Sequence, residues 1–334
     1  MNNIAVIGCG FWGPNLIRTF SRIEGVHITV CDVNINRLNE LKLAYPAVTV
    51  TQNFNDILLS NEINAVALAT PASTHFEMAK SALEKNKHVF VEKPLSILSS
   101  QAEQLIKIAR EKKKILMVGH TFEYNPAVVK LKEYIDSGEL GNIYYAYSSR
   151  LNLGQIREDI NAMWNLAPHD FSILIYLLGG KPSRVSAIGK AFIQNGIEDT
   201  VFITAEFGDI LAHVHVSWLY PSKVRQLTIV GDRKMVIYDD LDNEAKLKIY
   251  DKGISKISNE ETYGEYFLKL RTGDIYIPKI DLSEPLKLEV NHFVNCIRHG
   301  TESKTNGENG LRVVKTLEAA QRSLKNNGIF VDIV

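Results

Sequence analysis

The chain has 334 residues, which at about 150 residues per domain suggests two domains. Its 38 Lys and Arg residues balance its 38 Asp and Glu residues, so charge gives no reason to expect a nucleic acid or an anionic membrane as a partner. The sequence is 45% hydrophobic, has no apolar run near the roughly 18 residues of a membrane span, begins without a basic leader and contains three scattered cysteines, so we expect a soluble, reduced, cytoplasmic protein.

Residues 1–120 alternate short β-branched runs with longer segments of helical periodicity. The runs are continuously apolar, which is typical of parallel strands buried on both faces. Strand-then-helix repetition with short connections predicts a doubly wound parallel sheet in an α/β domain. The expected strands cover residues 4–7, 26–31, 65–69, 88–91 and 115–118.

The pattern changes after Gly119. Hairpin signals at Asn195-Gly196 and Gly208-Asp209 predict antiparallel strands, so we expect an α+β domain with a large open sheet. We place the domains at residues 1–122 and 123–334. In the second we expect a helix from Asn125-Pro126, a strand from 143, a helix over about 168–178, nearly continuous β structure over 185–250, loops over 251–285, and helices near 284–299 and 307–326.

The segment Gly8-Cys9-Gly10-Phe11-Trp12-Gly13 is a G-x-G-x-x-G loop between the first strand and a helix. Gly8 permits a tight turn, Gly10 lets a pyrophosphate approach the backbone, and Gly13 lets the helix pack on the strand. Asp32 ends the next strand, where a carboxylate binds ribose hydroxyls and repels a 2′-phosphate. This pattern predicts a dinucleotide site that prefers NAD to NADP.

Two further loops follow expected strands, Thr70–His75 and Glu92-Lys93-Pro94. Ligands of open α/β sheets bind at the carboxyl ends of the strands, so both loops should line the cofactor site. A desolvated lysine near an oxidised nicotinamide has a lowered pKa, which suits Lys93 to proton transfer. From position alone, Lys93 could equally be a surface lysine.

His169 follows Pro168, and proline is tolerated in the first turn of a helix, so we expect His169 near a helix N-terminus. The positive end of the helix dipole would keep the imidazole neutral and able to accept a proton. Asn165 lies four residues earlier and would share its face. A capping or core histidine is the alternative.

Together, the glycine loop with Asp32, Thr70-Pro71 with His75, Glu92-Lys93-Pro94 and the His169 helix resemble the Gfo/Idh/MocA family of oxidoreductases. The resemblance implies an N-terminal Rossmann domain, a C-terminal domain whose open sheet forms dimers or tetramers, and a cis bond between Lys93 and Pro94. It also implies that Lys93 and His169 are the catalytic pair, whose nitrogens we expect to meet at one nicotinamide. Asn165 stands where the family usually has an aspartate. The expected cofactor-binding residues are Gly8, Gly10, Phe11, Trp12, Gly13, Asp32, Thr70, Pro71, His75, Glu92 and Lys93.

Residues 119–126 and 150–154 are similar to the branch of the family that acts on nucleotide-linked sugars, in particular the 3-dehydrogenases of UDP-N-acetylglucosamine or its uronic acid. Arginines suit bidentate contacts with diphosphates or carboxylates. The expected substrate-binding residues are Lys93, Tyr124, Arg150, Asn152, Arg157, Asn161, Asn165 and His169.

Three alternatives stay open at this point. The chain could reduce a keto-sugar, or oxidise inositol or a free sugar. It could also be a non-catalytic NAD-binding regulator, since fold does not fix function. His213 and His215 point to one face of a strand and could hold a metal, but no third ligand is evident, so no metal site is predicted.

Overall fold

The computed structural model describes residues 2–154, 156–258 and 266–334. Within these ranges the chain forms two compact units. The first unit contains Met1–Tyr124 and Ser283–Glu318, and the second contains Asn125–Leu282 and Ala319–Val334. Each unit is described by itself below.

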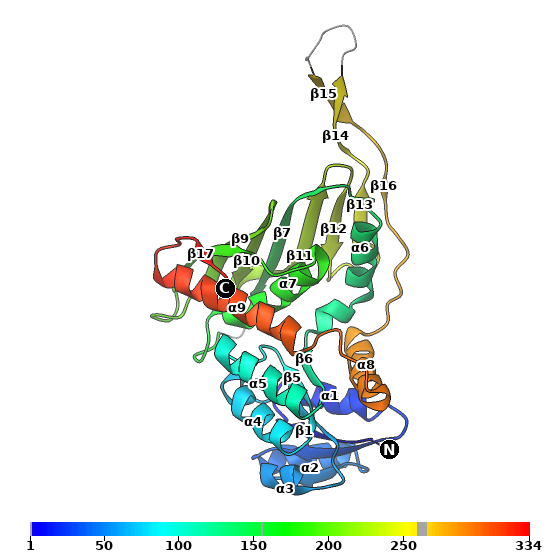
Figure 1. Ribbon diagram of the computed structural model, residues 1–334, viewed down its shortest axis with the longest axis vertical. Helices are drawn as coiled ribbons and strands as arrows, with labels where there is room; N and C mark the ends of the chain where they lie inside the picture. Colours follow the sequence, from blue (N-terminus) through cyan, green and yellow to red (C-terminus); the bar gives the residue numbers. More distant parts are fainter. Residues whose placement is uncertain (1, 155, 259–265) are drawn as a thin grey trace. The chain divides into compact units, whose positions relative to one another are not determined.

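The first unit is built on a parallel sheet of six strands in the order β3-β2-β1-β4-β5-β6, which confirms the expected doubly wound sheet (Figure 1). The strand β3 was not expected, and it is only three residues long. The strands are β1 (Asn2–Ile7), β2 (Val26–Cys31), β3 (Thr49–Thr51), β4 (Ala65–Leu68), β5 (His88–Glu92) and β6 (Leu116–Gly119). The helices are α1 (Gly13–Phe20), α2 (Ile35–Ala44), α3 (Phe54–Leu59), α4 (Ala72–Glu84), α5 (Ser99–Glu111) and the short 3₁₀ helix η1 (Thr121–Tyr124).

The central strands explain why this sheet forms. All four residues of β4 are fully buried, and so are Ile4, Ala5 and Val6 of β1. Strands covered on both faces bury every side chain, which is why their sequences are continuously apolar.

The helix α8 (Pro285–His299) belongs to the first unit, whereas the sequence-based boundary at residue 122 assigned it to the second domain. Its apolar stripe packs in the core of the first unit, where the Phe293 ring lies 6.3 Å from the Phe20 ring and 5.7 Å from the Phe90 ring. A single domain boundary in the sequence cannot represent α8, because this C-terminal helix packs in the core formed by the N-terminal strands and helices.

The second unit is built on a nine-stranded sheet in the order β16-β13-β12-β11-β7-β10-β9-β8-β17. Among the described strands of this sheet, β7 and β10 pair in parallel and the other neighbours are antiparallel, so the expected mostly antiparallel sheet is confirmed. The strands are β7 (Ile143–Leu153), β8 (Arg184–Lys190), β9 (Thr200–Phe207), β10 (Ile210–Ser217), β11 (Leu219–Gly231), β12 (Met235–Asp239), β13 (Leu247–Tyr250), β16 (Ile275–Tyr276) and β17 (Val331–Asp332).

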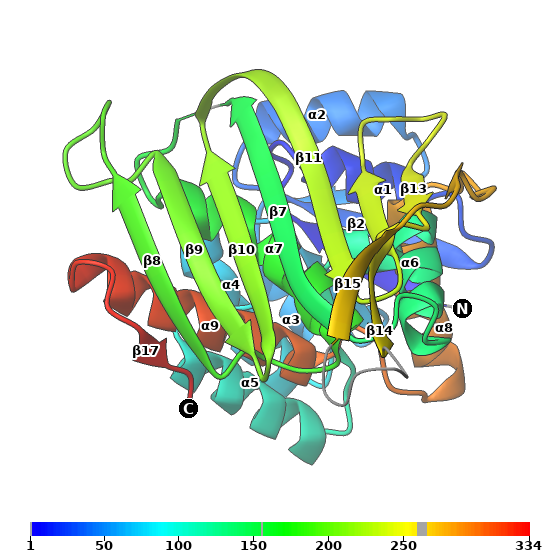
Figure 2. The same cartoon turned by 90° about the horizontal axis from the view of Figure 1, so that it is seen from above.

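Helices cover one face of this sheet and leave the other face open (Figure 2). The helix α7 (Ala162–Leu178) packs on β7, β9 and β10, and α6 (Pro126–Asp136) packs on α7 and β12. Along β10, Ala212, Val214 and Val216 are fully buried on the covered face, whereas the open face exposes Tyr147 and Phe202. The last helix, α9 (Gly307–Lys325), contributes residues to both units.

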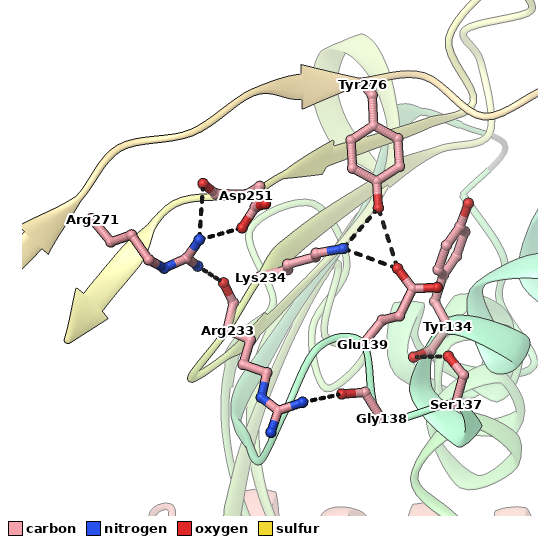
Figure 3. A network of polar contacts seen from close by, with 9 residues as sticks. All are labelled: Tyr134, Ser137, Gly138, Glu139, Arg233, Lys234, Asp251, Arg271 and Tyr276. Carbon is pink, nitrogen blue, oxygen red and sulfur yellow. Dashed lines mark hydrogen bonds and ion pairs between the residues drawn. The ribbon is translucent and has the colours of Figure 1, made fainter.

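The expected loops over 251–285 were partly wrong, because β14 (Gly253–Ser258) and β15 (Tyr266–Arg271) form a hairpin there. Residues 259–265 of that stretch lie outside the described ranges. Polar contacts hold the base of the hairpin (Figure 3): Arg271 pairs with Asp251 and donates to the main-chain oxygen of Arg233. Beside it, Lys234 donates to Glu139 at 3.0 Å.

Candidate active site

The glycine loop is shaped as a dinucleotide cradle. Gly8 has φ +91°, and a Cβ there would lie 2.8 Å from the main-chain oxygen of Ala69. A Cβ at Gly13 would lie 2.0 Å from the oxygen of Gly8, so helix and loop pack too closely for any side chain. Gly10 faces open space instead, with nothing within 4 Å. These three positions fit the expected roles of turn, pyrophosphate approach and helix packing.

Asp32 ties the end of β2 to this loop. Its buried carboxylate accepts the N–H of Cys9 at 2.5 Å through Oδ2 and the N–H of Asn34 at 2.8 Å through Oδ1. Each carboxylate oxygen can accept a second hydrogen bond, so Asp32 is placed to bind ribose hydroxyls. The Arg37 guanidinium lies 4.0 Å from the same carboxylate.

The remaining loop residues differ in exposure. Phe11 is 92% exposed and Trp12 is half-buried. Burial and the nearby Asp32 raise the pKa of the Cys9 thiol to about 12. A thiol that stays protonated is a poor nucleophile, so Cys9 has only a packing role here.

His75 fixes the turn that carries Lys93. Its Nδ1 lies 2.7 Å from the main-chain oxygen of Pro94, and its Nε2 lies 2.9 Å from that of Thr70. His75 belongs to α4, so this one side chain links the loop after β4 to the loop after β5. Burial lowers the pKa of His75, which keeps the ring neutral and able to donate to one of the two oxygens. The peptide bond between Lys93 and Pro94 is cis, as the family resemblance implied.

Besides His75, the titratable groups Glu92 and His120 lie near Lys93. Burial raises the pKa of Glu92 to about 7, and Lys93 offsets part of that rise. Gly119 is the register partner of Glu92, and a Cβ there would lie 3.1 Å from the Glu92 carboxylate. His120 follows directly and is buried, and burial followed by the charge of Lys93 lowers its pKa to about 3. The structure therefore gathers the expected cofactor residues and Lys93 at the carboxyl ends of β1, β2, β4 and β5.

His169 is not near a helix N-terminus, so that prediction was wrong. The helix α7 begins at Ala162, and Pro168 lies inside it. Asn161 caps the helix by accepting the N–H of Trp164 at 3.0 Å. Pro168 costs one backbone hydrogen bond, and a long buried helix with a strong cap tolerates that loss. Because dipole effects fade beyond the first turn, the dipole does not explain the protonation state of His169.

Asn165 and His169 do share a face of α7, as predicted. Both are half-buried, whereas the helix buries its neighbouring positions Ala167 and Asp170. The indole of Trp218 donates to Asn165 Oδ1 at 3.1 Å, which holds the amide in place. His169 belongs to the second unit and Lys93 to the first.

Several expected substrate residues have structural contacts. Arg150 and Asp170 form a buried ion pair at 2.8 Å, so Asp170 is not available to replace the aspartate missing at Asn165. Tyr124 is buried in the core of the first unit, with its hydroxyl 3.3 Å from Thr305. Besides capping α7, Asn161 donates to Glu198 at 2.7 Å.

Arg157 and Asn152 lie closer to the surface. Arg157 is bidentate with Asp159, at 2.8 and 2.7 Å, and Asn152 is half-buried beside Gly154. An arginine already paired with a carboxylate must exchange that partner to bind a diphosphate.

The histidines of β10 make ring contacts. His213 stacks on Tyr147 at 5.6 Å and His215 on Phe202 at 4.1 Å. In the part of the chain that the structure describes, no group of three or more His, Cys, Asp or Glu residues could hold a metal ion. No helix in the same part has the length and apolar character needed to cross a membrane.

Sequence reasoning missed two buried acids of the first unit. Glu123 and Glu289 are both fully buried in the first unit. Glu289 lies in the apolar stripe of α8 beside Val290 and Phe293. A glutamate within such a stripe is the signal that would have found it.

Comparison with known proteins identifies the family. Residues 2–120 match "Oxidoreductase family, NAD-binding Rossmann fold", and residues 128–237 match the "GFO/IDH/MocA C-terminal domain". The chain belongs to the Gfo/Idh/MocA family. It is therefore an oxidoreductase with an NAD-binding domain, which confirms the expected cofactor.

Two relatives indicate the range of activities in the family. The UDP-N-acetylglucosamine 3-dehydrogenase of Acidithiobacillus ferrooxidans is 27% identical over 316 residues, covering 92% of this chain and 93% of its own. The inositol 2-dehydrogenase of Rhizobium meliloti is 23% identical over 326 residues, covering 91% and 94%.

Solved structures support the fold. The WlbA dehydrogenase of Bordetella pertussis, in complex with NADH and UDP-GlcNAcA, superposes with a TM-score of 0.80 at 20% identity and covers 100% of this chain and 99% of its own. The structure of the Acidithiobacillus enzyme, GnnA, gives a TM-score of 0.81 at 23% identity, covering 97% of each chain.

Proposed function

We propose that this oxidoreductase transfers a hydride between NAD and a ring carbon of a sugar, namely C3 of UDP-N-acetylglucosamine or its uronic acid. The observation that carries the proposal is the gathering of the glycine loop, Asp32 and Lys93 at one edge of the first sheet. Such an edge is where α/β sheets bind their ligands.

The chain's own residues bind and orient the reactants. The glycine loop receives the pyrophosphate, and Asp32 accepts the ribose hydroxyls. NAD, when bound, supplies the hydride acceptor or donor. Phe11, Trp12, Thr70, Pro71, His75 and Glu92 complete the proposed cofactor contacts.

Lys93 and His169 are proposed to take and return the proton of the reacting hydroxyl. An amine and an imidazole are both suited to general acid–base work near neutral pH. Asn165 cannot ionise, so its proposed role is to orient the substrate and not to transfer a proton. Proton transfer is therefore assigned to Lys93 and His169. The proposed substrate contacts are Arg150, Asn152, Arg157 and Asn165. Tyr124 instead packs in the core of the first unit, and Asn161 caps α7 in the second.

The relatives support the choice of substrate class. The 27% identical relative is named a UDP-N-acetylglucosamine 3-dehydrogenase, and the similarity covers nearly the whole of both chains. The 23% identical inositol 2-dehydrogenase supports a second candidate, oxidation of a cyclic polyol. Reduction of the matching keto-sugar is the same reaction run backwards.

A substrate panel tests the proposal. The purified protein is incubated with NAD and, separately, UDP-N-acetylglucosamine, its uronic acid and myo-inositol, while the absorbance of reduced nicotinamide is followed. We expect turnover with a UDP-sugar and a 10²- to 10⁴-fold lower kcat in Lys93→Ala and His169→Ala. Turnover with inositol alone would favour the second candidate, and none with either class would indicate a regulator.

Oligomer formation and location belong to the same proposal. We propose a homodimer or homotetramer formed through the open face of the nine-stranded sheet, where Tyr145, Tyr147, Phe202 and Leu211 are 41–48% exposed. A cytoplasmic location is supported by the three cysteines, which are free and buried.

A further inference from the structure

Residues 191–197 join β8 to β9, and we call them the β8–β9 loop. This loop displays two neighbouring apolar side chains to solvent, since Phe192 is 68% exposed and Ile193 is 59% exposed. Its turn is formed by Asn195-Gly196, with Gly196 at φ +79°. The loop lies at the edge of the nine-stranded sheet where β7 and β10 also end (Figure 2).

A buried carboxylate holds the main chain of this loop. Asp199 is 1% exposed, and its Oδ2 accepts the N–H groups of Phe192 and Ile193, both at 2.9 Å. The N–H of Asp199 donates to the main-chain oxygen of Lys190 at 3.0 Å, which closes the base of the loop. These bonds fix the backbone that carries the two apolar side chains. A loop that is already ordered binds a ligand without the entropic cost of ordering.

Trp218 connects the β8–β9 loop with the face of α7 that carries Asn165 and His169. Its main-chain N–H donates to the oxygen of Asp199 at 2.9 Å, and its indole N–H donates to Asn165 Oδ1 at 3.1 Å. Its main-chain oxygen accepts the N–H of Gly154, just after β7, at 3.1 Å. Trp218 is buried, so this connection belongs to the core of the second unit. A single residue therefore separates the base of the loop from the proposed substrate contact Asn165.

A second set of contacts joins the loop to the segment that carries Arg157. The side chain of Gln194 donates to the main-chain oxygen of Arg157 at 3.4 Å. Just after the loop, the main-chain oxygen of Glu198 accepts the N–H of Ala162 at 2.8 Å, and its carboxylate accepts the Asn161 amide at 2.7 Å. An arginine suits the diphosphate of a nucleotide-linked sugar. In such a substrate the diphosphate is bonded to the nucleoside, so the surface that adjoins Arg157 is where the base arrives.

We propose that the β8–β9 loop is the nucleobase subsite of this enzyme and that Phe192 stacks on the uracil ring of a UDP-sugar. Every base has a π-face that stacks on an aromatic side chain, and one stacked base typically raises affinity by about tenfold. Ile193 adds apolar contact beside the ring. Myo-inositol has no group for this loop, so the loop favours a nucleotide-linked sugar over a free polyol. The inference deepens the proposed function, because it rests on a UDP-linked substrate.

Calorimetric titration of UDP into the NAD-saturated protein tests the subsite without turnover. We expect Phe192→Ala to raise the Kd for UDP by about tenfold, and Phe192→Tyr, which keeps the ring, to stay within about twofold of the parent. N-acetylglucosamine 1-phosphate has no base, so its Kd should be the same in all three proteins. Phe330→Ala is the matched control, because Phe330 is another partly exposed phenylalanine of the second unit, and it should change neither Kd.

Three results of this titration would overturn the subsite. The first is an unchanged Kd for UDP in Phe192→Ala. The second is an equal loss of UDP affinity in Phe330→Ala, because the effect would then not be specific to the loop. The third is a parent protein that binds UDP no more tightly than inorganic pyrophosphate, because the base then contributes nothing to binding.

Turnover separates this inference from the proposed function. With a UDP-sugar as substrate, we expect Phe192→Ala to raise KM by about tenfold and to keep kcat within about twofold, because the base is bound equally in the ground state and the transition state. A parent that oxidises a UDP-sugar while Phe192→Ala keeps the parent's KM would refute the subsite and leave the proposed function intact. If no sugar is oxidised, the proposed function fails, and the UDP titration still decides whether the loop binds a nucleobase.

Discussion

Asp32 is the residue that joins cofactor choice to loop shape. Its carboxylate holds the Cys9 N–H at 2.5 Å and so fixes the loop that would receive the pyrophosphate. The same negative charge disfavours a 2′-phosphate. We therefore propose that one side chain governs both loop geometry and the preference for NAD over NADP.

Replacing that charge should weaken the binding of NAD. We expect Asp32→Asn to raise the Kd for NAD by about ten- to a hundredfold, because charge-assisted hydrogen bonds to the ribose are lost. The preference for NAD over NADP should narrow. Calorimetric titration with both cofactors measures each change, and Glu40→Gln, which changes an exposed residue of α2, is the control. An unchanged ratio of the two Kd values would refute this role.

His120 predicts a pH dependence of stability. Burial and then Lys93 lower its pKa from 6.5 to about 3, so the unfolded chain binds a proton that the folded chain does not. The stability it contributes is present above pH 6.5 and is lost as the pH falls toward 3, by about 1.4 kcal/mol per unit. Thermal melting between pH 5 and 7 should show a smaller loss in His120→Asn than in the parent. The exposed His27→Asn should behave like the parent, and an equal loss in all three proteins would contradict the assignment.

Site residues were predictable from the sequence where a motif fixes the backbone. The glycine loop, Asp32 and the turn at Lys93 follow strand ends, so their positions come with the fold. The ion pair between Arg150 and Asp170 was not predictable in this way, because nothing in the local sequence indicates that the two side chains meet. Glu289 shows the same limit, since Thr121, which donates a hydrogen bond to its carboxylate, lies far from it in the sequence.

At the scale of elements, α7 is the helix on which the second unit depends. It covers three strands of the large sheet and carries both Asn165 and His169. Asn161 fixes the start of the helix through both polar atoms of its side-chain amide. Its Oδ1 accepts the N–H of Trp164 at 3.0 Å, and its Nδ2 donates to Glu198 at 2.7 Å. The cap places the start of the helix well before Pro168.

Removing this cap should destabilise the protein. We expect Asn161→Ala to lower the free energy of unfolding by about 1–2 kcal/mol, the usual cost of a lost N-cap. Asn161→Ser keeps an oxygen for the Trp164 N–H and should recover part of that loss. Urea unfolding followed by circular dichroism measures both variants, and equal losses would show that capping is not the source.

The elements themselves were predictable where periodicity was long and unbroken. The parallel strands and the two closing helices matched, whereas β3 was too short to leave a pattern. The rule that places proline in the first turn failed at Pro168, because a buried helix can lose one hydrogen bond. The hairpin of β14 and β15 was hidden by its polar sequence, and its base depends on Arg271, Asp251 and Arg233 from separate segments.

At the scale of the whole molecule, the chain combines a nucleotide-binding unit with a second unit whose large sheet has one open face. The exposed aromatic side chains of that face are the basis of the proposed self-association. Phe202 is 45% exposed and stacks on His215 at 4.1 Å, which makes it a suitable position to disturb.

A charge on this face should dissociate the oligomer. We expect the parent to sediment as a dimer or tetramer and Phe202→Glu as a monomer, because a buried unpaired carboxylate opposes association. Phe192→Glu changes a phenylalanine that is 68% exposed outside the strands, and it should leave the mass unchanged. A monomeric parent, or a Phe202→Glu variant of unchanged mass, would contradict an interface on the sheet.

The most direct test of the central claim follows the hydride itself. UDP-N-acetylglucosamine or its uronic acid, carrying deuterium at C3, is oxidised by the protein with NAD, and the reduced cofactor is analysed by mass spectrometry and NMR. The account predicts one deuterium at C4 of the nicotinamide and slower turnover than with the unlabelled sugar when the transfer limits the rate. Deuterium that stays on the sugar or is released to water while NADH forms would contradict it.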